Sequence, residues 1–226
     1  MRGKLIVFEG SEGGGKSTQI EKLRHWLVTH PWWQELGWEG ATPPKAIATR
    51  EPGGTELGDR LREMLLYGDF TPPLHDRAEL FLYAADRAQH VETFLKPHLE
   101  AGNLILCDRY VDSTIAYQGY GRGGDLDWIR RLNQMATNGL ESDLTFWLDV
   151  DVEVGLHRAR QSGKISDRME QAHLDFHRRV RQGYADLVAK QPDRKVRIDA
   201  NQPAAEVTVR IQEILGQHLR KWFASP

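Results

Sequence analysis

One glycine-rich segment has the residue types and the spacing needed to bind a polyphosphate. It lies between a short apolar run and a helical pattern, and it matches the P-loop pattern G-x-x-x-x-G-K-[ST]. In such loops, glycines let backbone N–H groups turn toward phosphate oxygens at the positive end of a helix. Lys16 is expected to reach the β- and γ-phosphates, and Ser17 to hold Mg²⁺ through its hydroxyl. The predicted nucleotide-binding residues are Gly10, Ser11, Glu12, Gly13, Gly14, Gly15, Lys16, Ser17 and Thr18. A glycine-rich turn without a ligand is the alternative, but motif and context agree on a phosphate site.

An acidic and a basic residue stand together after another apolar run. Asp108 and Arg109 follow Leu104 to Cys107, a run typical of a buried strand. Ligands of open α/β sheets bind at the carboxyl ends of strands, and a carboxylate there can hold Mg²⁺ directly or through water. Asp108 could instead cap the next segment. The adjacent arginine favours the ligand site, so we predict Ser17 and Asp108 as the metal ligands.

Arginines that follow predicted strands could bind the phosphate of an acceptor. The planar guanidinium fork fits phosphate oxygens. Arg50 follows the second predicted strand and Arg109 the third, both beside the P-loop strand. An isolated arginine is more often a solvated surface charge, but the positions of these two favour a role with phosphate.

A later basic stretch, about residues 158–170, separates two helical patterns. A short polar break containing a glycine is typical of a lid that closes over a transferring phosphate and excludes water. Basic residues at a helix end, which complement the helix dipole, are the alternative. The basic residues of the stretch are Arg158, Arg160, Lys164 and Arg168. The groups that we expect to gather the charge of the transition state are Lys16, Arg109, Arg158 and Arg168.

The elements that must position these residues alternate along the chain. Short apolar runs predict strands at Leu5 to Phe8, Ala46 to Thr49, Leu104 to Cys107, Leu144 to Leu148 and Val196 to Ile198. Amphipathic spacing predicts helices after Lys16, at Glu56 to Tyr67, Asp76 to Leu99 with an end or kink near Pro97, Leu126 to Asn138, Val152 to Arg160, Leu174 to Ala189, and from Val207. This order predicts an α/β fold with a largely parallel sheet. The segment from His30 to Lys45, with three tryptophans, interrupts the pattern and is predicted to be a surface loop.

Composition limits the function classes. The 226 residues suit a single domain, 1–226, with a sizeable core. Thirty basic residues against 32 acidic ones give a net charge of −2, which argues against broad binding to nucleic acid or to an anionic membrane. The one cysteine, Cys107, allows no internal disulfide and fits the cytoplasm. No stretch approaches the ~20 apolar residues of a membrane span, and the first apolar run is too short for a signal peptide.

The motifs together resemble the thymidylate kinase family, in the same order and over essentially the whole chain. The resembling stretches are Phe8-Glu9-Gly10 before the P-loop, Thr49-Arg50-Glu51-Pro52-Gly53-Gly54-Thr55, Asp108 to Gly119, Leu148-Asp149-Val150, Gly155 to Arg160, and Asp167-Arg168-Met169-Glu170. The second and third are far more specific than the P-loop. The resemblance implies the P-loop nucleoside monophosphate kinase fold: a five-stranded parallel sheet flanked by helices, with a short lid. It also implies transfer of the γ-phosphate of ATP–Mg²⁺ to dTMP in dTTP synthesis, and a homodimer joined through the long middle helices.

The same resemblance implies a role for individual residues. Glu12 would face the 3′-hydroxyl of the acceptor, while Arg50 and Arg109 would grip its phosphate. The residues around the nucleoside would be Tyr83 stacked on thymine, Arg87 donating to O4, Thr114 and Gln118 at the N3 edge, and Tyr117 near the 2′ position. The P-loop carries no basic residue before Lys16, as in the bacterial-type members whose lid supplies the cation.

Other interpretations stay open on the residues alone. A CMP/UMP kinase or a nucleoside kinase would share the P-loop and lid, although two phosphate-directed arginines favour a monophosphate acceptor. A nucleotide switch would need a base-recognition motif such as Asn-Lys-x-Asp, which the chain lacks. The near-neutral charge argues against a P-loop protein that acts on nucleic acid. For the kinase, we expect in-line transfer that depends on positioning and charge neutralisation rather than on a strong general base.

Overall fold

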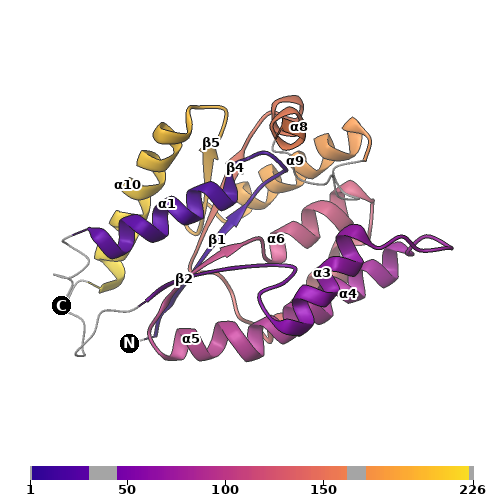
Figure 1. Cartoon of the computed structure of the whole chain (residues 1–226), viewed down its shortest axis with the longest axis horizontal. Helices are drawn as coiled ribbons and strands as arrows, with labels where there is room; N and C mark the ends of the chain where they lie inside the picture. Colours follow the sequence, from indigo (N-terminus) through magenta and orange to yellow (C-terminus); the bar gives the residue numbers. More distant parts are fainter. Residues whose placement is uncertain (1, 31–44, 162–171, 224–226) are drawn as a thin grey trace.

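The fold is built around one parallel sheet whose strands alternate with helices along the chain (Figure 1). The structure is a computed structural model and describes residues 2–30, 45–161 and 172–223. The strands are β1 (Lys4–Glu9), β2 (Ala46–Arg50), β3 (Leu104–Asp108), β4 (Leu144–Asp149) and β5 (Lys195–Asp199). They lie in the order β2-β3-β1-β4-β5 and all pairs are parallel. The predicted α/β class and the five-stranded parallel sheet are confirmed.

Helices cover both faces of this sheet. They are α1 (Lys16–Thr29), α3 (Glu56–Tyr67), α4 (Asp76–His90), α5 (Lys96–Glu100), α6 (Val111–Thr114), α7 (Leu126–Thr137), α8 (Val152–Gln161), α9 (Leu174–Lys190) and α10 (Ala204–Phe223). Two π-helical segments, η1 (Val91–Leu95) and η2 (Ile115–Gly121), continue α4 and α6.

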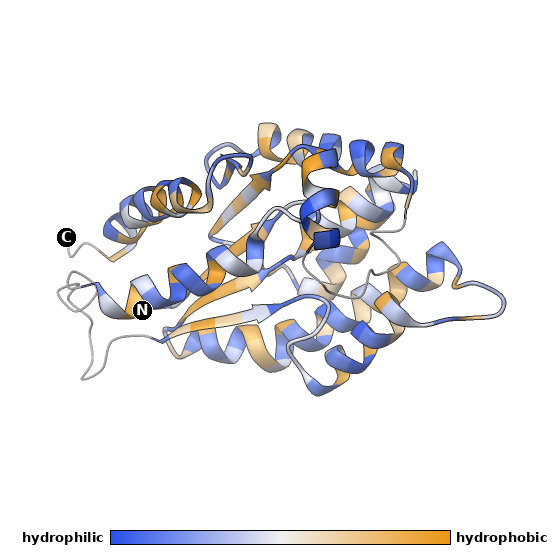
Figure 2. Ribbon diagram, turned by 45° about the horizontal axis from the view of Figure 1, so that its top comes forward, coloured by the Kyte–Doolittle hydropathy of each residue, from blue (hydrophilic) through white to orange (hydrophobic). Residues whose placement is uncertain are grey.

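Alternate residues of the central strands enter different cores. Ile6 and Phe8 pack with α1 and α10, while Leu5 and Val7 pack with η1 and α5. Figure 2 shows apolar residues concentrated along the central strands, between the helical layers. Because both faces are covered, the strands appear in the sequence as continuous apolar runs without polar alternation. α9 packs on η2 and on Trp147 of β4, which brings the second half of the chain against the segment after β3.

The predicted elements lie where the periodicity placed them, with two differences. The helix from Asp76 runs to Glu100, and a π-helical turn at Val91–Leu95 precedes Pro97. Pro97 has no N–H to donate, so the helical hydrogen-bond pattern changes just before it instead of ending. The second difference is the helical segment Val111–Gly121, which the periodicity did not predict.

The sheet brings the carboxyl ends of three strands to one edge. Phe8 of β1 pairs with Asp108 of β3, and Arg50 of β2 pairs with the same Asp108. The P-loop after β1 and the two arginine-bearing segments therefore start side by side. In the described part of the chain, no helix is both long enough and apolar enough to cross a membrane. The tryptophan-rich residues 31–44 lie outside the described residues.

Candidate active site

The P-loop has the backbone shape of an anion cradle. Gly13 has φ +67°, and a Cβ there would lie 2.0 Å from the carbonyl oxygen of Gly155, so a side chain cannot fit. Gly15 has φ +84° and precedes α1, whose first turn receives no hydrogen bond from a side-chain cap. The first N–H groups of α1 are thus left to a ligand at the positive end of the helix.

Lys16, Ser17 and Asp108 meet where β1 and β3 end. The Nζ of Lys16 donates to the carbonyl oxygens of Gly10 and Ser11, each at 3.0 Å. Ser17 Oγ donates to Asp108 Oδ2 at 2.9 Å. The other carboxylate oxygen, Oδ1, is buried and has no hydrogen-bond partner among the described residues. A hydroxyl beside a carboxylate with an unsatisfied oxygen fits Mg²⁺, which takes oxygen ligands and keeps several from water or phosphates.

Glu12 and Arg109 form the junction between the P-loop and a neighbouring pocket. Arg109 Nη2 donates to Glu12 Oε1 and to the Tyr117 hydroxyl, and the Tyr117 hydroxyl donates to Glu12 at 3.0 Å. Burial alone would raise the pKa of the Glu12 carboxyl, but Arg109 and Lys16 outweigh it and lower that pKa to about 2. Glu12 is therefore a hydrogen-bond acceptor at neutral pH and a poor proton acceptor.

Arg109 sits in an unusual backbone conformation that a buried carboxylate supports. Its φ is +70°, a region that non-glycine residues rarely adopt. Glu9 holds the segment that follows: Oε1 accepts from the N–H of Tyr110 at 2.8 Å and of Ser113 at 3.2 Å. Oε2 accepts from Ser113 Oγ at 2.6 Å and from the Tyr184 hydroxyl at 3.1 Å. Glu9, the last residue of β1, thus caps the start of α6, because the residue before α6 supplies no side-chain cap.

A second acidic residue, Asp112, lies near Glu9. Burial and the nearby Asp112 raise the pKa of Glu9 to about 7, while Ser113, Arg109 and Tyr110 act in the opposite direction. Asp112 itself forms a buried ion pair with Lys195 of β5, with Oδ2 2.6 Å from Nζ. Nothing in the local sequence indicated the clamping role of Glu9, because its partners lie 101 to 175 residues away.

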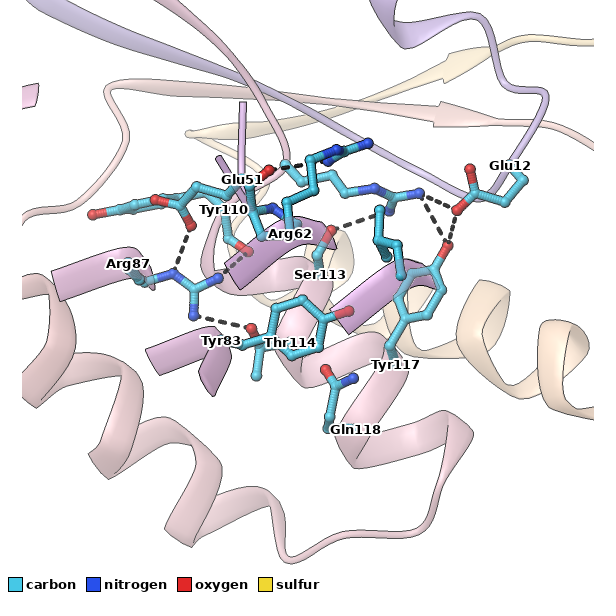
Figure 3. A pocket seen from close by; sticks show the side chains of 13 residues that line it. Glu12, Glu51, Arg62, Tyr83, Arg87, Tyr110, Ser113, Thr114, Tyr117 and Gln118 are labelled. Carbon is cyan, nitrogen blue, oxygen red and sulfur yellow. Dashed lines mark hydrogen bonds and ion pairs between the residues drawn. The ribbon is translucent and has the colours of Figure 1, made fainter. Parts of the chain in front are cut away.

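The pocket beside the P-loop has the size of a nucleoside site. It encloses about 570 Å³ counted out to its open mouth, within the range of small-molecule sites (Figure 3). Its lining includes seven residues predicted for the acceptor, namely Glu12, Tyr83, Arg87, Arg109, Thr114, Tyr117 and Gln118. Six further residues complete it: Glu51, Pro52, Arg62, Leu66, Tyr110 and Ser113. The structure thus brings together almost all of the predicted acceptor residues.

Arg87 is held rigidly in the pocket wall. It is 2% exposed, and Nε donates to Glu51 at 2.8 Å. Nη1 donates to Thr114 Oγ1 and Asn133 Oδ1, and Nη2 donates to the Tyr110 carbonyl oxygen. These bonds use four of the five guanidinium N–H groups, which leaves one on Nη2. The predicted donation to thymine O4 would have to come from that group.

Two arginines near the pocket differ from the sequence prediction: Arg50 lies outside it, and Arg62, which was not predicted, lines it. Arg50 does not line the pocket; its Nη2 lies 3.3 Å from Asp59 Oδ1, and both side chains are more than half exposed. Arg62, which the sequence analysis missed, lines the pocket from α3 and donates to the Pro52 carbonyl oxygen at 3.0 Å. Burial and the charges of Arg50 and Arg109 lower the pKa of Arg62. Three cations lie close enough to repel one another, which favours a dianion between them.

The predicted lid lies largely outside the described residues. Residues 158–161 belong to α8, and residues 162–171, with Lys164 and Arg168, are not described. Arg158 does not line the pocket: its guanidinium donates to the carbonyl oxygens of Ala200 at 2.8 Å and Asn201 at 3.4 Å, after β5. The structure therefore places Lys16 and Arg109 at the site, and it does not bring Arg158 to it.

A parallel sheet in this strand order, with a P-loop after its central strand and a cationic acceptor pocket beside the loop, defines a P-loop nucleotide kinase. Comparison with known proteins gives the family. The model of the family described as thymidylate kinase matches residues 8–211. A thymidylate kinase of Cyanothece sp. is 55% identical over 99% of this chain and 97% of its own length. One of Trichodesmium erythraeum is 55% identical, over 98% and 99%.

A solved structure of the same family also resembles this chain. The crystal structure of thymidylate kinase from Ehrlichia chaffeensis has a TM-score of 0.72 and 31% identity, covering 95% of this chain and 99% of that one. The chain belongs to the thymidylate kinase family, and it is an ATP-dependent phosphotransferase.

Proposed function

We propose that this pocket performs the reaction of its family: transfer of the γ-phosphate of ATP to dTMP, giving dTDP for dTTP synthesis. The observation that carries the proposal is the Glu12–Arg109–Tyr117 cluster. It joins the P-loop to a pocket with an aromatic ring, Tyr83, and amide and guanidinium groups on its wall. A donor phosphate on the loop and an acceptor phosphate beside Arg109 would therefore meet at one point.

The donor end would be held by the P-loop. The N–H groups at the start of α1 and the Nζ of Lys16 would bind the phosphate oxygens, and burial together with Arg109 lowers the pKa of Lys16. Ser17 and Asp108 would hold Mg²⁺, which neutralises phosphate charge when it is bound. Asp108→Asn should raise the Mg²⁺ concentration for half-maximal activity by about tenfold or more, with little change in the KM for dTMP. An unchanged Mg²⁺ requirement would remove Asp108 from the metal site.

The acceptor end would bind the phosphate through cations and the base through fixed polar groups. Arg109 and Arg62 face the pocket, and Arg50 could swing from Asp59 to join them. Glu12, ionised because of its low pKa, would accept from the 3′-hydroxyl. Tyr117 would leave no room at the 2′ position, since its ring lies in the wall and its hydroxyl is bonded to Glu12. A phosphate monoester is largely ionised near pH 7, so no strong base is required.

ADP formation with a panel of acceptors tests this function. dTMP, dUMP, UMP, CMP, AMP and GMP would each be offered with ATP and Mg²⁺, with Lys16→Ala as the inactive control. We expect fast turnover with dTMP, slower turnover with dUMP and near-background rates with the others. If dTMP gave no more ADP than ATP alone, the acceptor assignment would be wrong.

The assembly and the compartment are further parts of the proposal. α3 and α4 lie side by side, and α4 contacts α7 (Figure 1). These helices carry exposed apolar side chains: Leu57, Met64, Phe81, Trp128 and Met135. A second copy of the chain would bury them, so we expect twice the monomer mass in light scattering, and Met135→Glu should shift it toward one chain. The buried Cys107, whose thiol pKa is raised by burial, fits a reducing cytoplasm, which cell fractionation would test.

A further inference from the structure

A buried carboxylate outside the pocket holds the amide of Gln118. Glu79, on α4, is 0% exposed, and its Oε1 accepts from Gln118 Nε2 at 3.0 Å. Arg122 grips the same carboxylate with two bonds: Nε to Oε1 at 3.1 Å and Nη2 to Oε2 at 2.9 Å. A carboxylate paired in this way accepts hydrogen bonds and donates none. The NH₂ end of Gln118 must therefore point toward Glu79.

The opposite end of the amide is left for a ligand. Gln118 lines the pocket, and Figure 3 shows its amide at the wall beside Tyr83 and Tyr117. Its Oε1 accepts no hydrogen bond from the described residues, in contrast to Nε2. With Nε2 committed to Glu79, Gln118 offers an incoming base an acceptor and no donor.

We propose that Glu79 is a positioning residue that makes the site selective for pyrimidines carrying an N3–H. Thymine and uracil donate from N3, so they complement the Gln118 carbonyl. Cytosine has a lone pair at N3, which would face that carbonyl and leave both acceptors unpaired in a buried site. This inference rests on the proposed function, because it specifies how the same pocket reads its acceptor.

Arg87 provides a second and separate source of selectivity. Its remaining N–H can donate to the O4 of thymine or uracil but not to the amino group of cytosine. Loss of Glu79 should therefore weaken the rejection of cytosine without abolishing it. Neither group distinguishes thymine from uracil, since both bases have the same N3 and O4 pattern.

The test is the kcat/KM of Glu79→Gln with dTMP, dUMP and dCMP. A glutamine at 79 can donate or accept, so it no longer fixes Gln118. We expect the dTMP/dCMP ratio of kcat/KM to fall about tenfold or more, while the dTMP/dUMP ratio changes less than about twofold. Glu79→Asp, which keeps the charge for Arg122 but shortens the reach to Gln118, should act in the same direction and serves if Glu79→Gln does not fold.

Asp76→Asn is the matched control. Asp76 also pairs with Arg122, with Oδ1 3.1 Å from its Nη1, and it is exposed. This change should leave both ratios intact. A dTMP/dCMP ratio that stays constant in both Glu79 variants would overturn the proposal, as would an equal fall in the dTMP/dUMP ratio, which indicates a generally loosened pocket. A wild-type chain without dTMP activity would instead overturn the proposed function itself.

Discussion

Arg109 and Arg50 stand at the carboxyl ends of two neighbouring strands, yet the protein's own hydrogen bonds hold only Arg109 in the pocket. Arg109 donates to the Gly10 carbonyl oxygen, Ser113, Tyr184, Glu12 and Tyr117. The guanidinium of Arg50 instead pairs with the exposed Asp59. Arg50 is the last residue of β2 and pairs with Asp108, whereas Arg109 lies one residue beyond β3. The two arginines are therefore offset by one position, and the loops that follow the two strands are anchored differently.

Both loops are anchored by buried carboxylates, but at different points. Glu9 binds the residues directly after Arg109, and so fixes the arginine itself. In the loop after β2, Glu51 pairs with Arg87 and His90, and Asp86 accepts from the N–H of Gly53. Those contacts hold residues 51 and 53 and leave the side chain of Arg50 outside. Arg109 is therefore preorganised, whereas Arg50 must be ordered when the acceptor binds, at a cost in side-chain entropy.

Removal of Arg109 should have the largest effect. Arg109→Ala leaves Glu12 without its partner and takes a cation from the phosphate, so we expect kcat/KM for dTMP to fall about 10³-fold or more. Arg109→Lys keeps the charge but loses the guanidinium fork, so it should retain only part of the wild-type kcat/KM. Steady-state kinetics would measure both values, with circular dichroism as the folding control. Equal losses for Arg109→Ala and Arg50→Ala would contradict the comparison.

Weakening the clamp on Arg109 should have the next largest effect. Glu9→Gln keeps the shape but puts an N–H where the carboxylate accepted, so we expect kcat to fall about 100-fold with the KM for ATP nearly unchanged. Ser113→Ala, which deletes one partner of Glu9, is the milder matched variant.

The pH profile separates this role from general damage. The pKa of Glu9 is raised to about 7, so wild-type kcat should decline as the pH falls below about 7 and the carboxylate takes a proton. Glu9→Gln should lack this part of the acid limb, although ionisation of the substrate phosphate remains. Identical acid limbs in the two proteins would show that Glu9 does not control Arg109.

Asp86, which anchors the loop after β2 by accepting from the N–H of Gly53, should affect stability rather than catalysis. Burial and the charge of Glu51 raise the pKa of Asp86 from 3.8 to about 7. The folded state therefore binds its proton more tightly, and this stabilisation is present at low pH and lost as the pH rises toward 7. Asp86→Asn keeps the acceptor for Gly53 and removes the charge. Between pH 5 and pH 8, its free energy of unfolding should fall about 2–3 kcal/mol less than that of the wild type in urea titrations. If the free energies of unfolding of the two proteins changed in parallel with pH, the raised pKa of Asp86 would be contradicted.

The sequence was sufficient to predict the strands and most helices, but not the charged residues that hold the site in place. Strands and amphipathic helices follow from local periodicity, and the P-loop is a contiguous motif. The segment Val111–Gly121 was missed because its β-branched, aromatic and glycine residues favour helix weakly, and it is held by Glu9 and by packing on α9. Glu9, Glu79 and Arg62 were missed for a related reason. Each looks locally like an ordinary charged residue, and only the fold brings its partners within reach.

Loss of Arg50 should have the smallest effect, and its partner provides the control. Arg50→Ala removes a cation that binding must first order, so we expect the KM for dTMP to rise about tenfold while kcat changes little. Asp59→Asn releases Arg50 from an exposed ion pair worth well under about 1 kcal/mol. The KM for dTMP should then fall slightly, by about twofold at most, because no ion pair with residue 59 has to be broken when Arg50 turns to the phosphate. If Arg50→Ala lowered kcat by as large a factor as Glu9→Gln does, Arg50 would also be fixed in the reacting complex. The contrast with Arg109 would then hold only for the free protein.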